Sequence, residues 1–208
     1  MKDQQKLWKS IWKDGSKGDV NDFALRSFSD IKNKPFRTLL DLGCGTGVDS
    51  IYFAQQGLDV TAVDFSDTGL EYLRQAAQQA GLNNIHPVQM DFQNLDFPPN
   101  SFDVIYAHLT LHYFDDKTTS VIFDNLYGLM KDQGLFFIKC KSIDDPLYGK
   151  GEKVEENMFV RNDHVRHFFS VDYMKEKLHK FKIIEVRKTS STYHEYQSNF
   201  IEAVATKP

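Results

Sequence analysis

The stretch from Thr38 to Ser50, TLLDLGCGTGVDS, constrains the fold of this chain more than any other. After Thr38 come three leucines interrupted by one carboxylate, which is typical of a strand buried in a parallel sheet. Glycines at alternate positions, Gly43, Gly45 and Gly47, then lead into a helical pattern. Glycine permits positive φ and lets backbone N–H groups approach a ligand closely. The stretch predicts a strand, a ligand-binding loop and a helix start, although an ordinary strand-to-helix turn can also hold three glycines.

A second carboxylate ends the next predicted strand, where Leu58 to Val63 is followed by Asp64. In a nucleotide-binding βαβ unit, a carboxylate at this place accepts hydrogen bonds from ribose hydroxyls. An Asp that follows a strand without such a context is more often a helix or turn cap. The glycine loop upstream supplies the context, so Asp64 is predicted to lie at the ribose.

The glycine spacing disfavours two common phosphate sites. The dinucleotide fingerprint G-x-G-x-x-G/A fits poorly, because Val48 stands at the position of its last small residue. A P-loop is excluded because no Gly-Lys-Ser/Thr closes the loop. Asp41 stands two residues before Gly43, and its negative charge would repel a phosphate but can hold an ammonium group.

Four ordered motifs resemble those of class I S-adenosylmethionine-dependent methyltransferases. They are Asp41 to Gly47, Asp64, Met90 to Phe92, and Phe102 to Ile105, and the likeness extends from about Arg37 to Cys140. The resemblance implies an α/β fold, a Rossmann-like doubly wound sheet of seven strands that is mostly parallel with an antiparallel C-terminal hairpin. It also implies S-adenosylmethionine as the cofactor, with Asp91 on the adenine amino group and Phe92 beside the ring.

Ligands of open α/β sheets lie beyond the carboxyl ends of the strands. This adds the residues that follow the fourth strand to the expected cofactor site. The complete set of expected cofactor-binding residues is Asp41, Gly43, Cys44, Gly45, Thr46, Gly47, Asp64, Phe65, Met90, Asp91, Phe92, His108 and Leu109.

The segments after the fourth and fifth strands are expected to face the methyl acceptor. His112 and His167 are the candidate catalytic residues, as a general base or as groups that position the acceptor, and His108 is a further candidate base. The candidate substrate-binding residues are Tyr113, Tyr148, Arg166 and Trp12. His108 and His112 have the spacing of a zincin pair, but Leu109 stands where that motif needs Glu, so no metal site is predicted.

A single methyltransferase domain is predicted over residues 1–208. Residues 1–34 form an N-terminal helical cover, with amphipathic stretches at Leu7 to Trp12 and Val20 to Ile31. Residues 35–141 form the cofactor-binding core, 142–169 a substrate-side insertion of loop character, and 170–208 a helix and hairpin. Pro87 predicts an edge position or an irregular start for the third strand, and Lys131 to Gly134 is predicted to turn into a fifth strand, Leu135 to Cys140.

Composition restricts the partners. A net charge of −4 without a basic stripe argues against nucleic acid. Two cysteines supply neither a disulfide framework nor a Cys-rich zinc site. No apolar run has the length of a signal peptide or a membrane span. We therefore expect a cytoplasmic monomer or homodimer that acts on a small-molecule acceptor, with neither nucleic acid nor membrane as a partner.

The sequence leaves the acceptor and two other functions open. A sulfonium methyl group is already activated, so direct SN2 transfer depends chiefly on positioning. The layout resembles the small-molecule methyltransferases of the thiopurine and tellurite-resistance type, which act on soft sulfur, selenium or tellurium centres. A non-catalytic S-adenosylmethionine-binding module would keep the same motifs. An NAD(P)-dependent oxidoreductase would want Tyr-x-x-x-Lys, which occurs three times and is therefore unspecific: Tyr113/Lys117, Tyr127/Lys131 and Tyr173/Lys177.

Overall fold

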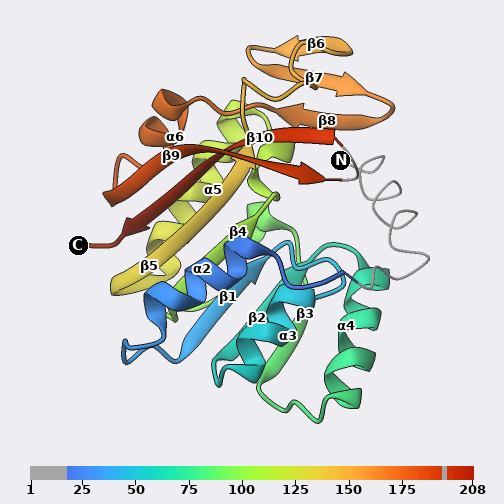
Figure 1. The fold of residues 1–208 in the computed structure, drawn as a ribbon. Coiled ribbons are helices and arrows are strands. Elements are labelled where there is room, and N and C mark those ends of the chain that lie inside the picture. Colours follow the sequence, from blue (N-terminus) through green and yellow to red (C-terminus); the bar gives the residue numbers. More distant parts are fainter. Residues whose placement is uncertain (1–17, 194–195) are drawn as a thin grey trace.

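The computed structural model describes residues 18–193 and 196–208. Its main element is a seven-stranded sheet of order β3-β2-β1-β4-β5-β10-β9 (Figure 1). The parallel strands are β1 (Thr38–Leu42), β2 (Asp59–Asp64), β3 (Ile85–Gln89), β4 (Phe102–His108) and β5 (Met130–Lys141). β10 (Tyr196–Thr206) pairs antiparallel with both β5 and β9 (Lys182–Tyr193). The predicted fold class is confirmed.

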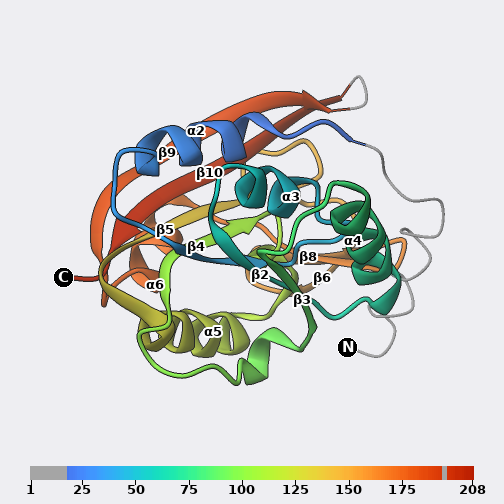
Figure 2. The same cartoon turned by 90° about the horizontal axis from the view of Figure 1, so that it is seen from below.

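Helices cover both faces of this sheet (Figure 2). On one face lie α2 (Asp22–Ile31), α3 (Val48–Gln55) and α4 (Asp67–Gln79), and on the other α5 (Asp116–Leu129) and α6 (Val171–Lys177). Two of these helices begin at serine N-caps, because the Ser66 hydroxyl accepts from Gly69 N and the Ser170 hydroxyl from Tyr173 N. Within the described ranges, no helix is long and apolar enough to cross a membrane.

The apolar β1 run is buried on both sides, as its composition predicts. Leu40 and Leu42 pack in the core formed with α5 and α6, and Leu39 packs in the core formed with α2, α3 and α4. All three side chains are fully buried. Burial of a leucine contributes about 1.5–3 kcal/mol, so this strand holds the glycine loop at its carboxyl end on a rigid base.

Two expectations about the second half of the chain are wrong. The strand expected from Leu135 begins at Met130, which pairs with Phe102, and the predicted turn is an irregularity inside β5. The insertion expected to be a loop contains a three-stranded antiparallel sheet, formed by β6 (Glu152–Glu155), β7 (Met158–Arg161) and β8 (His164–His167).

Other expectations about the elements stand. The amphipathic stretch from Val20 is α2, and Pro87 lies in β3, an edge strand of the large sheet. Short 3₁₀ helices follow two strands of the large sheet, η2 (Phe92–Asn94) after β3 and η3 (Leu111–Tyr113) after β4. The amphipathic stretch from Leu7 to Trp12, including the candidate substrate residue Trp12, lies outside the described residues.

Candidate active site

Three positions of the loop between β1 and α3 require glycine. Gly43, Gly45 and Gly47 have φ values of +79°, +55° and +79°, which L side chains rarely adopt. A Cβ on Gly43 would lie 1.9 Å from the hydroxyl of Thr110, which belongs to the loop after β4. A Cβ on Gly47 would lie 2.3 Å from Leu73 of α4. The loop is therefore wedged between the β4 loop and α4.

The Asp64 carboxylate fastens this loop to the end of β2. One oxygen accepts a hydrogen bond from Gly45 N at 2.9 Å, and the other accepts one from Ser66 N at 2.8 Å. The side chain is 6% exposed, and burial raises its pKa. Each carboxylate oxygen can accept a second hydrogen bond, so Asp64 can hold the loop and still bind ribose hydroxyls.

Asp41 lies deeper, in β1, and is only 3% exposed. The hydroxyl of Ser50 donates a hydrogen bond to its carboxylate. Burial is the main cause that raises the Asp41 pKa to about 8, with smaller contributions from the nearby charges of Asp49 and Asp64. An adjacent cation would favour the ionised form, which suits a residue predicted to hold an ammonium group.

The third carboxylate of the row, Asp91, caps η2. Its Oδ1 accepts a hydrogen bond from Gln93 N at 3.0 Å. The next residue, Phe92, is buried against Phe114 with ring centroids 6.0 Å apart. Met90 N donates to the backbone oxygen of Asp64 at 3.1 Å, which ties this segment to the end of β2.

Three carboxylates thus follow one another along the carboxyl edge of the sheet. β1, β2 and β3 are neighbours in parallel register, with Asp41 opposite Ala62 and Asp64 opposite Gln89. Asp91 follows β3 by two residues. S-adenosylmethionine offers an ammonium group, ribose hydroxyls and an adenine amino group, all hydrogen-bond donors, and a row of acceptors fits this set.

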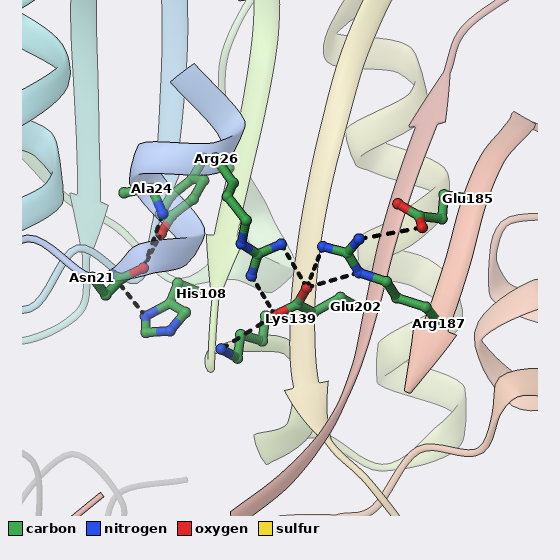
Figure 3. A network of polar contacts seen from close by, with 9 residues as sticks. Asn21, Ala24, Arg26, His108, Lys139, Glu185, Arg187 and Glu202 are labelled. Atoms are coloured by element: carbon green, nitrogen blue, oxygen red, sulfur yellow. Dashed lines mark hydrogen bonds and ion pairs between the residues drawn. The ribbon is translucent and has the colours of Figure 1, made fainter. Parts of the chain in front are cut away.

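His108, the last residue of β4, belongs to a polar cluster that the sequence analysis did not predict. Its Nδ1 lies 3.4 Å from Nδ2 of Asn21, the residue that caps α2 (Figure 3). The same Asn21 amide donates to Asp49 in α3. The hydroxyl of Tyr106 donates to Asp49 Oδ2 at 2.9 Å. These contacts join α2 to the helix that follows the glycine loop.

The contacts also define the state of the His108 ring. Burial, followed by the charge of Lys139, lowers the pKa of His108 to about 3, so the ring is neutral at pH 7. An amide N–H from Asn21 leaves Nδ1 as the acceptor, which puts the proton on Nε2. Leu109, the next residue, has a φ of +55°, and its N–H donates to Lys139 O.

A second network fixes α2 to the sheet farther along the helix. Arg26 makes a two-pronged contact with Glu202 of β10, with both N–O distances at 2.9 Å (Figure 3). Arg187 of β9 and Lys139 of β5 bind the same carboxylate at 3.0 and 3.3 Å. Burial alone would raise the Glu202 pKa, but these cations outweigh it and lower the pKa to about 2.

On the acceptor side, His112 of η3 is buried, with 1% of its surface exposed. Its Nδ1 has no hydrogen-bond partner among the described residues. Burial, followed by the charges of Arg166 and Lys141, holds the pKa of His112 well below 6.5. The β8 strand, which carries Arg166, packs against η3. The predicted residues Tyr113, His112 and Arg166 therefore belong to one region.

The other two acceptor candidates are already bonded. His167 is buried, with Nδ1 3.2 Å from the backbone oxygen of Phe114, and burial lowers its pKa. The Tyr148 hydroxyl donates to Asn157 at 2.8 Å, and its side chain is 40% exposed. His167 adjoins the region of η3, whereas Tyr148 packs on Phe159 and Phe168, beside the small sheet.

Sequence reasoning missed Asn21 and Asp49. Each carries a weak local signal, because Asn is a good N-cap and Asp is favoured in the first turn of a helix. Those signals indicate helix ends and say nothing of the contact between α2 and α3.

Comparisons with known proteins agree with this geometry. The family model described as "Methyltransferase domain" matches residues 39–134. Cypemycin N-terminal methyltransferase from Streptomyces sp is 42% identical over 106 residues, which are 50% of this chain and 42% of that protein. Malonyl-[acyl-carrier protein] O-methyltransferase from Enterobacter lignolyticus is 30% identical over 52% of this chain and 41% of that protein. The chain thus matches about two fifths of the length of these two relatives.

A solved structure shares the fold over nearly the whole chain. Burkholderia thailandensis 1,6-didemethyltoxoflavin-N1-methyltransferase, with bound 1,6-didemethyltoxoflavin and S-adenosylhomocysteine, superposes with a TM-score of 0.80 at 20% identity, covering 99% of this chain and 88% of that one. The family match covers the glycine loop and the four motif strands, so the resemblance to class I S-adenosylmethionine-dependent methyltransferases is confirmed over residues 39–134, and the solved structure shows that the fold is shared.

Proposed function

We propose that this protein transfers the methyl group of S-adenosylmethionine to a small-molecule acceptor. The observation that carries the proposal is the row of acidic acceptors at the ends of three neighbouring strands. Asp41 would hold the ammonium group, Asp64 the ribose hydroxyls, and Asp91 the adenine amino group, with Phe92 beside the ring. Gly43, Cys44, Gly45, Thr46, Gly47, Phe65, Met90, His108 and Leu109 would form the rest of the cofactor site.

When bound, S-adenosylmethionine supplies a methyl group on a positively charged sulfur. In a direct SN2 transfer the acceptor lone pair forms the new bond to carbon, the carbon–sulfur bond breaks, and its electron pair stays on sulfur. The chain's own contribution is to hold the acceptor in line and to exclude water. No protein nucleophile takes part.

The histidines of the acceptor side are proposed to position the acceptor. His112 and His167 both have lowered pKa values, which makes them neutral at pH 7 and weak as proton acceptors. A neutral imidazole can still donate or accept a hydrogen bond. An acceptor that already presents a lone pair, such as a thiolate or a neutral amine, suits this arrangement best.

A small-molecule acceptor is supported by the character of the chain and its relatives. The net charge is −4, so a phosphate backbone would be repelled rather than attracted. The Burkholderia neighbour is named for a small-molecule acceptor. The cypemycin and acyl-carrier-protein relatives are named for other acceptors, so the domain alone does not select one.

Calorimetric titration with S-adenosylhomocysteine tests the cofactor site. Asp64→Ala should weaken binding by about 10- to 100-fold, because charge-assisted hydrogen bonds of about 1.5–3 kcal/mol are lost. Asp64→Asn keeps an acceptor for Gly45 N and separates ligand binding from loop stability. Asp59→Ala is the matched control, an exposed carboxylate at the start of β2, and should bind like the wild type.

A second measurement separates an enzyme from a binding module. Transfer of a labelled methyl group to a panel of thiols, phenols and amines should yield methylated product. Cofactor binding without transfer to any acceptor would favour the non-catalytic module, and absence of S-adenosylhomocysteine binding would overturn the proposal.

A further inference from the structure

We propose that the methyl acceptor carries an anionic group, such as a carboxylate, and that Arg166 binds it beside His112. The inference rests on the proposed function, because it needs an acceptor site next to the proposed cofactor site. It narrows the acceptor from any small molecule to an acidic one.

The first observation is an unpaired guanidinium. Arg166 is partly buried in β8, and no described carboxylate forms an ion pair with it. Other partly or fully buried cations do have partners: Lys139 binds Glu202, Lys141 binds Asp145 at 2.9 Å, and Lys177 binds Asp116 at 2.5 Å. A charge that is partly removed from water and has no partner is unfavourable, and a ligand carboxylate would supply the missing partner in a two-pronged contact.

The second observation is a buried ring nitrogen with nothing to bond. His112 Nδ1 is buried and has no hydrogen-bond partner among residues 18–193 and 196–208. Buried polar atoms are nearly always hydrogen-bonded, so an exception in a region already predicted to be functional points to a ligand. His112 lies four residues beyond His108, where β4 ends. The His112 ring thus lies between the end of β4 and the β8 strand, which carries Arg166.

The third observation is the sign of the charges around that nitrogen. Arg166 and Lys141 act on His112 in the same direction, and both disfavour a positive charge on its ring. Lys141 is largely neutralised by Asp145, whereas Arg166 is not. Excess positive charge in one region concentrates anions there. A neutral His112 adds a hydrogen bond without adding another charge.

Arg161 shows what an arginine without this role looks like. It lies at the end of β7 in the same small sheet, opposite His164 of β8, and is exposed. Its guanidinium is hydrated and needs no partner. Arg161 therefore provides a control with the same side chain and the same sheet, at a position exposed to solvent.

The test uses matched acid and amide probes on the full chain. Wild type, Arg166→Gln, Arg166→Lys and Arg161→Gln are first titrated with S-adenosylhomocysteine. The saturated proteins are then titrated with para-mercaptobenzoate, para-hydroxybenzoate and para-aminobenzoate, and with the three corresponding carboxamides. The three pairs vary the acceptor atom and hold the anionic group constant.

We expect at least one benzoate to bind wild type about tenfold or more tightly than its amide, the size expected for a charge-assisted pair. Arg166→Gln should remove this difference, Arg166→Lys should restore part of it, and Arg161→Gln should keep it. All four proteins should bind S-adenosylhomocysteine equally.

Three results would overturn the inference. Wild type would bind acids and amides equally, the preference for the acid would persist in Arg166→Gln, or none of the three benzoates would bind. These outcomes differ from failure of the proposed function, in which S-adenosylhomocysteine itself does not bind to wild type.

Discussion

At the scale of single residues, the three carboxylates at the carboxyl edge of the sheet differ in how deeply they are buried. Asp41 is nearly sealed, and its pKa is raised to about 8, mainly by burial. In the ligand-free protein at pH 7 only about one tenth of it is ionised. Binding of a ligand ammonium group should favour the charged form, so below pH 8 complex formation should release a proton.

This linkage predicts a pH dependence of cofactor affinity. We expect the dissociation constant of S-adenosylhomocysteine to fall as pH rises from 6 to 8, by up to about tenfold per pH unit, and then to level off. Titrations in buffers of different ionisation enthalpy would count the released proton. Asp41→Asn should bind more weakly and lose this dependence. An affinity that is constant across this range in the wild type would show that Asp41 does not contact the ammonium group.

Residues whose role depends only on the local backbone conformation could be predicted from the sequence. Gly43 and Gly47 were predicted because their spacing and position after a strand have a direct backbone cause, and the structure gives both a positive φ. Asn21 was not predicted, because its role depends on a contact with Asp49, 28 residues away. A pattern along the chain carries no information about such a pair.

At the scale of elements, α2 connects α3, the helix after the glycine loop, with the end of β4. Its N-terminal cap, Asn21, holds Asp49 and touches His108, and its middle is fixed to the sheet by Arg26. The helix was predicted from its amphipathic pattern. The small sheet β6-β7-β8 was not, because strands of four residues joined by two-residue turns are too short for a periodic signal.

Two substitutions at Asn21 separate capping from contact with the site. Asn21→Ala removes the acceptor for Ala24 N and should lower the free energy of unfolding by about 1 kcal/mol. Asn21→Ser restores a cap and should recover most of that loss. Both remove the amide that holds Asp49, so both should weaken S-adenosylhomocysteine binding by about three- to tenfold. Urea unfolding and calorimetry give the two readings, and affinity that recovers together with stability in the serine variant would contradict this division.

At the scale of the whole molecule, Glu202 ties together parts distant in sequence. Its carboxylate binds Arg26 of α2, Lys139 of β5 and Arg187 of β9 (Figure 3). The folded-state pKa is lowered from 4.5 to about 2. The resulting stabilisation is fully present above pH 4.5 and is lost as pH falls toward 2.

Glu202→Gln should therefore lower the free energy of unfolding at pH 7 by about 2 kcal/mol, because Lys139 is left buried without its counter-charge. The loss should shrink at pH 3, because Glu202 is then protonated in the unfolded wild type and folding must release that proton. Urea unfolding at both pH values measures this. Glu185→Gln is the control, since Glu185 is an exposed partner of Arg187 and should change stability by less than about 0.5 kcal/mol. Equal losses in the two variants would contradict a central role for Glu202.

The overall topology was the most predictable property, because the alternation of apolar strands with helices and caps repeats along the chain. The hairpin of β9 and β10 was expected from the family resemblance, and the edge position of Pro87 from its missing backbone donor. The early start of β5 was missed because Lys131 to Gly134 has the composition of a turn, and its irregular pairing with β4 is imposed by the sheet.

The contact between Gly43 and Thr110 sets a condition for redesign of this protein. The hydroxyl of Thr110 occupies the space beside Gly43 where a Cβ would otherwise stand, so the loop proposed to bind the donor and the loop proposed to face the acceptor share a boundary. A library that randomises residues after β4 to obtain new acceptors would, at position 110, also deform the donor loop. Libraries that hold Thr110 constant and vary its neighbours would explore acceptor choice without that interference.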